Sequence, residues 1–302
     1  MKKIKDVIIF LDTDKHVSPF DTLLVIDNFP HVEVHHYSQV EPSDARGLTQ
    51  DAMFPRGPEG AAHTKLFIGG YDFDKAEAIL ETVKSTMFSP FEMAVIMDPR
   101  GANTTGAAMV TKVLGLLDKK RLGGFEHKKA AILAGTGPVG QICAKLMAID
   151  GAGVSITSRQ EAKAKAVAEK LNKSLGANKV QGLQASNPEE TAVTIKDAEV
   201  ILATGAAGTQ LLPLTILKEE AKQCNVLADV NAVPPYGIEG LKPKDEGVEV
   251  IPGVLGVGAL AIGALKNKVE VELIKRALAS SKGIFDHTIA YQIAKSLAKK
   301  KK

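Results

Sequence analysis

Short apolar runs alternate with amphipathic stretches between residues 124 and 252. The apolar runs are typical of buried strands and lie at Ala130–Ala134, Val154–Thr157, Lys179–Gln184, Glu199–Ala203 and Val226–Val230. Helical periodicity separates them, for example at Glu161–Leu171 and Leu214–Ala221. Strands that alternate with helices in this way predict a parallel sheet covered by helices on both faces.

A second α/β pattern covers residues 1–123. Its expected strands are Val7–Leu11, Val32–His36, Lys65–Ile68 and Met93–Met97, and its helical patterns are Pro19–Asp27 (a helix or a turn), Asp74–Thr86 and Thr104–Leu117. Two more helical patterns, Leu260–Ser280 and Asp286–Lys299, follow the last expected strand. We therefore expect two domains: residues 124–255, inserted into a second α/β domain of residues 1–123 and 256–302.

A glycine motif follows the first strand of the inserted domain. Gly135, Gly137 and Gly140 fill the positions of G-x-G-x-x-G. The first glycine permits a tight turn, the second lets the backbone approach a pyrophosphate, and the third lets the helix pack on the strand. The next helix, from about Val139, would point its free N–H groups at the phosphates. We therefore expect a Rossmann-like dinucleotide-binding domain whose turn contacts the ligand through Gly135, Thr136, Gly137, Pro138, Val139 and Gly140. A glycine-rich crossover without a ligand is the alternative.

The end of the second strand indicates which dinucleotide binds. Ser158 and Arg159 stand where an NAD-binding domain usually carries an aspartate or glutamate, and Lys163 follows one helical turn later. An arginine can form a fork on a 2′-phosphate, and a serine can donate to it. This set favours NADP, with NAD possible, although Lys163 alone is equally typical of a solvated surface charge.

Further polar clusters follow other expected strands, where open α/β sheets place ligands. Thr204, Gly205, Ala206 and Asn231 are expected to line the nicotinamide side of the coenzyme site. Candidate substrate contacts are Asp12, Asp14, Asp98, Asn103, Thr104 and Thr105. For several of these side chains, a role in turns or helix caps is the alternative. Lys266 and Lys268 follow a glycine-rich segment, and a pair of surface lysines is the alternative for them.

Composition narrows the class of protein. The chain has 302 residues, 45% of them hydrophobic, and a net charge of +3, and Lys299–Lys302 alone supply four positive charges. The remainder is therefore near neutral, which does not suggest a nucleic-acid partner. No apolar run is long enough for a membrane span, and Cys143 and Cys224 are too few for a disulfide framework. We expect both cysteines to be small core residues of a protein in a reducing cytoplasm. No metal-ligand spacing occurs among the histidines and cysteines, so we expect no bound metal.

The whole sequence resembles a known family. The matching segments are FLDTD (10–14), SPFD (18–21), LFIGG (66–70), FSPFEMAVIMDPRGANTTGAA (88–108), AAILAGTGPVG (130–140), ADVNAVPPYGIEG (228–240), GALAIGALKNK (258–268) and GIFD (283–286). They run in order over nearly the full length. On these segments the chain is similar to the NAD(P)-dependent methylene-tetrahydromethanopterin dehydrogenases of methylotrophic bacteria, which are related to the methylene-tetrahydrofolate dehydrogenases.

The resemblance implies a function and a set of roles. It implies a homo-oligomeric enzyme of one-carbon metabolism that transfers hydride from 5,10-methylene-tetrahydromethanopterin to NAD(P)+. We expect Lys266 to contact the pterin or its reacting end, and Asp14, Asn103 and Thr104 to orient the ring; the choice between Lys266 and Lys268 stays open. Methylene-tetrahydrofolate as the substrate is one alternative. A module that binds NADP without catalysis is another.

Overall fold

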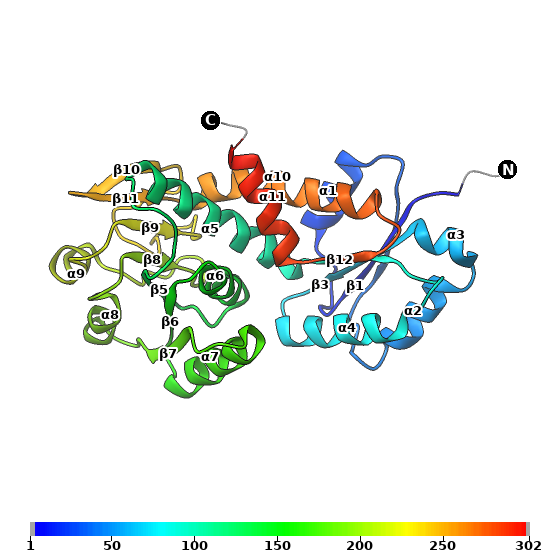
Figure 1. Ribbon diagram of the computed structural model, residues 1–302, viewed down its shortest axis with the longest axis horizontal. Helices are drawn as coiled ribbons and strands as arrows, with labels where there is room; N and C mark the ends of the chain where they lie inside the picture. The colour runs from blue at the N-terminus through cyan, green and yellow to red at the C-terminus, as the bar shows by residue number, and fades with distance from the viewer. Residues whose placement is uncertain (1–3, 300–302) are drawn as a thin grey trace. The chain divides into compact units, whose positions relative to one another are not determined.

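The computed structural model describes residues 4–299 and divides into two compact units, each with its own sheet (Figure 1). Unit 1 contains Met1–Thr104 and Asn267–Ile293, and unit 2 contains Thr105–Lys266 and Ala294–Lys302. The chain passes from one unit to the other within helices, namely α5 (Ala102–Lys119), α10 (Ala259–Leu278) and α11 (His287–Lys299). The limits that we expected, residues 123 and 255, stay predictions. Of the lysine tail, residues 300–302 lie outside the described residues.

Unit 1 contains a five-stranded sheet in the order β12-β4-β3-β1-β2, in which every pair of neighbours is parallel. Its strands are β1 (Val7–Asp12), β2 (Glu33–Tyr37), β3 (Thr64–Gly69), β4 (Ala94–Met97) and β12 (Gly283–Phe285). The central strand β3 is buried along its whole length, as expected for a parallel sheet covered on both faces. Phe10 and Phe67 stack within its core with ring centroids 4.5 Å apart.

The helices of unit 1 cover both faces of this sheet. Figure 1 shows α1 (Pro19–Asn28) on one face and α2 (Ala45–Met53) and α4 (Phe73–Thr86) on the other; the short α3 (Gly57–Ala62) precedes β3. Side-chain caps start two of these helices: Ser18 accepts from the N–H of Asp21, and Asp72 accepts from the N–H of Lys75. This winding directs the carboxyl ends of β1, β3 and β4 to one edge of the sheet.

Unit 2 contains a seven-stranded sheet in the order β10-β11-β9-β8-β5-β6-β7. Its strands are β5 (Lys129–Leu133), β6 (Gly153–Ser158), β7 (Val180–Gln184), β8 (Val200–Ala203), β9 (Val226–Asp229), β10 (Glu246–Ile251) and β11 (Val254–Val257). All pairs are parallel except β10 with β11. Without β10, this is the strand order 3-2-1-4-5-6 of the Rossmann fold, which turns back between β5 and β8 and leaves a crevice there.

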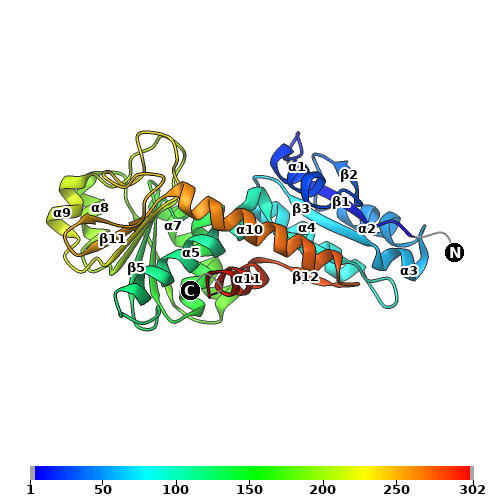
Figure 2. The ribbon, with the colours of Figure 1, turned by 90° about the horizontal axis from the view of Figure 1, so that it is seen from above.

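The helices of unit 2 also lie on both faces. Figure 1 shows α6 (Pro138–Ile149) and α7 (Glu161–Leu175) on one side of the strands, and α8 (Pro188–Ile195) and α9 (Leu214–Glu220) on the other. The turned view in Figure 2 again places α8 and α9 side by side. Glycines allow close packing on the first face, because a Cβ on Gly182 would lie 2.3 Å from the Ala164 carbonyl.

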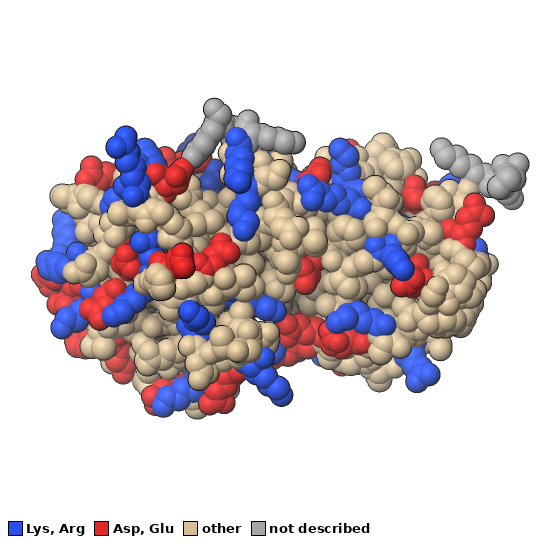
Figure 3. All heavy atoms as spheres, viewed as in Figure 1, with Lys and Arg blue, Asp and Glu red and all other residues tan. Residues whose placement is uncertain are grey.

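The α/β fold with parallel sheets is confirmed, but the sequence pattern missed five elements: α2, α3, β10, β11 and β12. The strand β12 has only three residues, too few for a period to be read, and the apolar run of β11 is interrupted by Gly256 and lies between Gly253 and Gly258. Within residues 4–299, no helix is long and apolar enough to cross a membrane. On the face seen in Figure 3, lysine and arginine side chains are interspersed with aspartate and glutamate.

Candidate coenzyme and substrate sites

The glycine turn between β5 and α6 is shaped by close backbone packing. A Cβ on Gly140 would lie 2.6 Å from both the Cα and the carbonyl oxygen of Gly135, and a Cβ on Gly135 would lie 2.8 Å from the Ile132 carbonyl. Real Cβ contacts are not this short, so helix α6 approaches strand β5 only because both residues are glycine. The N–H of Ala134, at φ 53°, donates to the hydroxyl of Thr157 at 3.0 Å.

Gly137 differs from its two neighbours in the motif. Apart from its two neighbours in the chain, no residue of the described range 4–299 has an atom within 4 Å of a Cβ built on it, and its φ of −75° is open to any residue. Neither packing nor backbone strain in the protein therefore requires a glycine there. Gly137 also stands at the N-terminus of α6, whose first N–H groups attract anions. This combination fits a phosphate group that approaches the backbone.

A cavity of about 450 Å³ opens beside this turn. Its walls contain six residues that we expected at the coenzyme, namely Thr136, Ser158, Arg159, Lys163, Gly205 and Ala206. They come from the segments after β5, β6 and β8, which lie next to one another in the sheet. The cavity is therefore at the carboxyl edge of the strands where the winding reverses, as in dinucleotide-binding sheets.

The segment after β7 supplies a wall of the cavity that sequence reasoning missed. Ala185, Ser186, Asn187 and Pro188 all line it. The pair Asn187-Pro188 was a readable signal, because asparagine followed by proline is a common start of a helix. Asn187 indeed caps α8, with its side-chain oxygen 2.8 Å from the N–H of Glu190.

The two cations of the cavity lie on one rim. Arg159 directly follows β6 and Lys163 lies in the first turn of α7, and both are exposed. The hydroxyl of Ser158 accepts from the N–H of Gln160 at 3.2 Å, which holds the turn that carries Arg159. The rim therefore presents two positive charges and a hydroxyl to the cavity.

Thr204 and Asn231 hold the loops after β8 and β9. The Thr204 hydroxyl donates to the carbonyls of Leu133 and Ala134, at 3.2 and 3.3 Å, which fixes the β8 loop against the glycine turn. The Asn231 oxygen accepts from the N–H groups of Gly208 and Val233, at 3.2 and 2.9 Å, so it joins the two loops.

In unit 1, Asp12 and Asp14 follow β1. Asp12 is buried, and one of its oxygens accepts from the N–H of Asp14 at 2.8 Å. Burial raises the pKa of Asp12 above its usual value. Asp14 is partly exposed and pairs with Arg100, which follows β4. The two loops therefore meet at the carboxyl edge of the sheet.

Asp98 organises the start of α5. Its oxygens accept from the N–H groups of Asn103 and Thr104, at 2.8 and 3.1 Å, and from the Thr104 hydroxyl at 2.6 Å. The Asn103 amide donates to the Met97 carbonyl, but its side-chain oxygen is buried and has no hydrogen-bond partner among residues 4–299. Buried polar atoms are rarely left unpaired, so this oxygen is the candidate here for a hydrogen bond to a ligand. Thr105 is partly buried in the next position of the helix.

Lys266 and Lys268 lie in α10 with different exposure. Lys266 is 9% exposed, whereas Lys268 is exposed. Glu270, one turn after Lys266, is fully buried. Buried charged side chains are rare, so Lys266 is the lysine of this pair that merits a functional explanation.

Within residues 4–299, no group of three or more histidine, cysteine, aspartate or glutamate side chains is arranged to hold a metal ion.

Two proteins of Methylorubrum extorquens are similar to this chain over almost its full length. The bifunctional protein MdtA is 35% identical over 294 residues, which are 97% of this chain and 99% of the relative. An NAD(P)-dependent methylenetetrahydromethanopterin dehydrogenase is 33% identical over 287 residues, 94% of this chain and 96% of the relative.

The chain belongs to the methylene-tetrahydromethanopterin dehydrogenase family. The model of this family's N-terminal domain, described as "Methylene-tetrahydromethanopterin dehydrogenase, N-terminal", matches residues 19–100, which lie in unit 1. The family expected from the sequence segments is therefore confirmed.

Solved structures support the same fold. Quinate dehydrogenase from Corynebacterium glutamicum, in complex with NAD, aligns with a TM-score of 0.52 at 11% identity, over 97% of this chain and 99% of its own. Shikimate 5-dehydrogenase from Listeria monocytogenes aligns with a TM-score of 0.50 at 15% identity, over 89% and 91% of the two chains. At such low identity these likenesses concern the fold alone, and they agree with the Rossmann strand order of unit 2.

Proposed function

We propose that this protein is an NAD(P)-dependent dehydrogenase that oxidises 5,10-methylene-tetrahydromethanopterin to the 5,10-methenyl form. The observation that carries the proposal is a relationship of 33% identity, over 94% of this chain, to a protein named for that activity. The cavity beside the glycine turn adds independent support, because it stands at the dinucleotide position of a Rossmann sheet.

The residues around the cavity fit a nicotinamide dinucleotide. The open space over Gly137 suits the pyrophosphate, and the α6 N-terminus provides N–H donors for it. Gly205 and Ala206, which lack bulky side chains, suit the approach of a flat nicotinamide ring. The bound nicotinamide would supply the hydride acceptor, and the protein would supply its position.

NADP is the proposed preferred coenzyme. Support comes from Arg159 and Lys163, which lie on the rim where the ribose 2′-position is expected, and from Ser158 beside them. A guanidinium recognises a phosphate through two parallel hydrogen bonds, whereas an NAD-specific site needs an acceptor for the ribose hydroxyls.

The chemistry needs positioning more than proton transfer. The methylene carbon lies between two nitrogens, so loss of hydride gives a cation delocalised over N–C–N, and no proton leaves in that step. The enzyme's task is therefore to hold the carbon against the nicotinamide ring and to exclude water, which would hydrolyse the product.

Unit 1 is the proposed substrate unit. The unpaired oxygen of Asn103 would accept a hydrogen bond from the pterin, while Asp98 and Thr104 hold the helix turn that presents it. Lys266 is a separate candidate, because it is the residue of helix α10 at which the first segment of unit 2 ends. It would contact a carbonyl or carboxylate of the substrate, since a positive charge beside the new cation would oppose the reaction. With Lys266→Ala we expect the kcat/KM to fall about a hundredfold, whereas Lys268→Ala, its exposed neighbour, should stay near wild type.

A direct assay tests the function. Purified protein is mixed with methylene-tetrahydromethanopterin and NADP+, then with NAD+ and with methylene-tetrahydrofolate in turn, and absorbance of NAD(P)H and of the methenyl pterin is followed. We expect the fastest turnover with tetrahydromethanopterin and NADP+. Coenzyme binding without turnover of either pterin would overturn the proposal in favour of a non-catalytic module.

The variant Arg159→Ala tests the coenzyme preference in the same assay. The KM for NADP+ should rise about a hundredfold and the KM for NAD+ by less than about threefold, because only NADP+ carries the 2′-phosphate. Equal losses for the two coenzymes would contradict a 2′-phosphate contact.

A further inference from the structure

Three loops of unit 1 bring together side chains that the proposed function has not used together. Asp14 follows β1, Tyr71 follows β3 and Arg100 follows β4, and these strands are neighbours in the order β4-β3-β1. All the strands are parallel, so the three loops share the carboxyl edge of the sheet. Ligands of open α/β sheets bind at this edge.

Arg100 is held rigidly at this edge. Its Nε donates to Asp14 Oδ2 at 2.9 Å, and its Nη2 donates to the same oxygen and, at 3.2 Å, to the His16 carbonyl. Its backbone has a φ of 48°, which is uncommon for a residue other than glycine and persists only where surrounding contacts enforce it. The guanidinium therefore has a fixed direction, set by Asp14.

Tyr71 lies against this guanidinium. The Arg100 guanidinium carbon is 4.5 Å from the centroid of the Tyr71 ring, and the backbone N–H of Tyr71 donates to Asp14 Oδ1 at 3.0 Å. Asp14 thus anchors both partners of the stack, one through each oxygen. Yet Tyr71 is 72% exposed, the highest exposure among the large hydrophobic side chains of unit 1 within residues 4–299.

An ordered but exposed aromatic ring is a surface for stacking. One face of Tyr71 rests on a cation, which withdraws electron density from the ring, and the other is open to a planar group. An electron-rich planar ring, such as the amino-substituted pyrimidinone half of a tetrahydropterin, is the complementary ligand. Arg100 has its Nε and one Nη engaged by Asp14, so it backs the ring rather than reaching for the ligand.

We propose that Tyr71, backed by Arg100 and anchored by Asp14, is the surface on which the planar aminopyrimidinone half of the substrate's reduced pterin stacks. The proposal rests on the proposed function, because it names how that substrate is recognised. It makes Tyr71 a binding residue. Asp14 then becomes a positioning residue that acts through Tyr71 and Arg100.

The test compares Tyr71→Leu with Tyr71→Phe. Leucine removes the ring, and phenylalanine keeps it without the hydroxyl. We expect the KM for the methylene carrier to rise about tenfold in Tyr71→Leu and to stay within about twofold of wild type in Tyr71→Phe. Calorimetric titration of the coenzyme-free proteins with the methenyl carrier should show dissociation constants that change, relative to wild type, by the same factors as the KM.

Phe88→Leu is the matched control, because Phe88 is also an exposed aromatic residue of unit 1 but precedes β4 rather than following it. It should leave the KM for the carrier unchanged, and all three variants should bind NADP+ with wild-type affinity. Wild-type carrier affinity in Tyr71→Leu would overturn the stacking surface while leaving the proposed function intact. Failure of the wild-type protein to bind either carrier would overturn both.

Discussion

Single glycines in the turn after β5 serve two different purposes. Gly135 and Gly140 are required by packing within the protein, whereas no described atom near Gly137 requires a glycine. The motif was recognisable in the sequence, since its spacing and its place after an apolar run are local properties. The different roles of the glycines were not recognisable, because they depend on atoms of Ile132 and Thr204 that lie close to Gly135 and Gly140 only in the folded chain.

Two alanine substitutions separate these roles. Gly140→Ala should lower the free energy of unfolding by about 2 kcal/mol, because its Cβ would overlap the backbone of Gly135. Gly137→Ala should change it by less than about 0.5 kcal/mol but weaken NADP+ binding at least about tenfold. Urea unfolding and equilibrium titration measure the two effects. Undiminished coenzyme affinity in Gly137→Ala would argue against a phosphate at this position.

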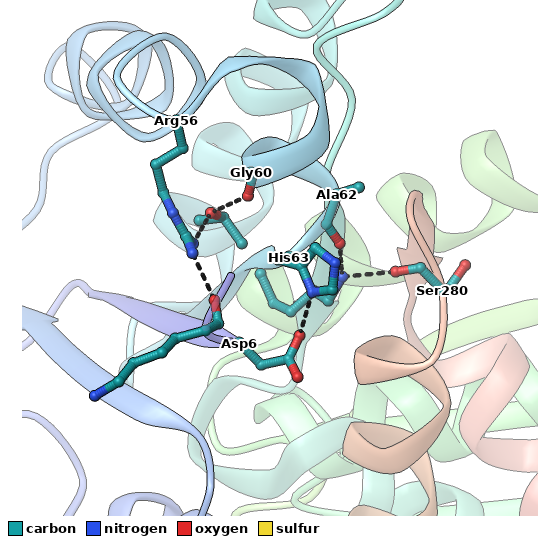
Figure 4. A network of polar contacts seen from close by, with 9 residues as sticks. Asp6, Arg56, Gly60, Ala62, His63 and Ser280 are labelled. Atoms are coloured by element: carbon teal, nitrogen blue, oxygen red, sulfur yellow. Dashed lines mark hydrogen bonds and ion pairs between the residues drawn. The ribbon is translucent and has the colours of Figure 1, made fainter. Parts of the chain in front are cut away.

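Lys65 shows a second property of single residues that only the fold determines. It lies in the buried strand β3, and its ammonium donates to the backbone carbonyls of Ala62 and Ser280 (Figure 4). A contact of 2.8 Å between Nδ1 of His63 and a carboxylate oxygen of Asp6 lies in the same network. Burial lowers the pKa of Lys65 from 10.5 to about 8.

The shifted pKa of Lys65 predicts how stability depends on pH. Between pH 8 and 10.5 the unfolded chain binds the Lys65 proton and the folded chain releases it, so stability should rise with pH across this interval. The gain for wild type relative to Lys65→Met should reach about 3 kcal/mol in the free energy of unfolding. Denaturant unfolding of both proteins at several pH values measures this gain. If the free energies of unfolding of the two proteins changed in parallel with pH, Lys65 would have an ordinary pKa.

At the scale of elements, most helices and strands follow from the periodicity of the sequence. The start of α5 shows what periodicity leaves out. A cap role for polar residues such as Asn103 and Thr104 was an alternative at the level of the sequence, but Asp98, which follows β4, accepts hydrogen bonds from the backbone N–H groups of both. A short 3₁₀ turn, Pro99–Gly101, separates Asp98 from the helix, and Arg100 and Gly101 within it both have a positive φ. Such a turn cannot be read from a pattern of apolar positions.

Removal of the Asp98 carboxylate should therefore lower the free energy of unfolding more than removal of an ordinary helix cap. Asp98→Ala leaves two N–H groups and a hydroxyl without their buried acceptor, so we expect the free energy of unfolding to fall by about 3 kcal/mol. Asp72→Ala, which removes the exposed cap of α4, should cost only about 1 kcal/mol. Urea unfolding compares the two variants. Equal losses would mean that Asp98 acts only as a surface cap.

At the scale of the whole molecule, the chain builds two sheets from interleaved segments. Unit 1 takes residues from both ends of the chain, since β12 pairs with β4 although about 190 residues separate them, as Gly283 opposite Ala94 shows. From the helical patterns beyond the last expected strand, the sequence predicted that the C-terminal segment rejoins the first domain. It did not predict that this segment also contributes a strand, because three residues are too few to show a period.

The two units should respond separately to the two ligands. NADP+ alone should slow the hydrogen exchange of backbone amides in unit 2, around residues 134–140 and 204–210. The methylene carrier alone should slow the hydrogen exchange of backbone amides in unit 1, around residues 12–16, 70–71 and 98–104. Binding stabilises the segments that it contacts against local opening. Protection by the carrier confined to unit 2 would contradict the assignment of unit 1 to the substrate.

Features that depend on neighbours along the chain could be predicted from the sequence. Apolar periods indicated most helices and strands, the glycine spacing indicated the dinucleotide turn, and the segment matches indicated the family. Contacts between side chains that are far apart in the chain became visible only in the folded protein. Arg100 pairs with Asp14 from 86 positions away, and Lys65 reaches Ser280 from 215 positions away. Such partners are chosen by the order in which strands join a sheet, and that order is a property of the packed molecule.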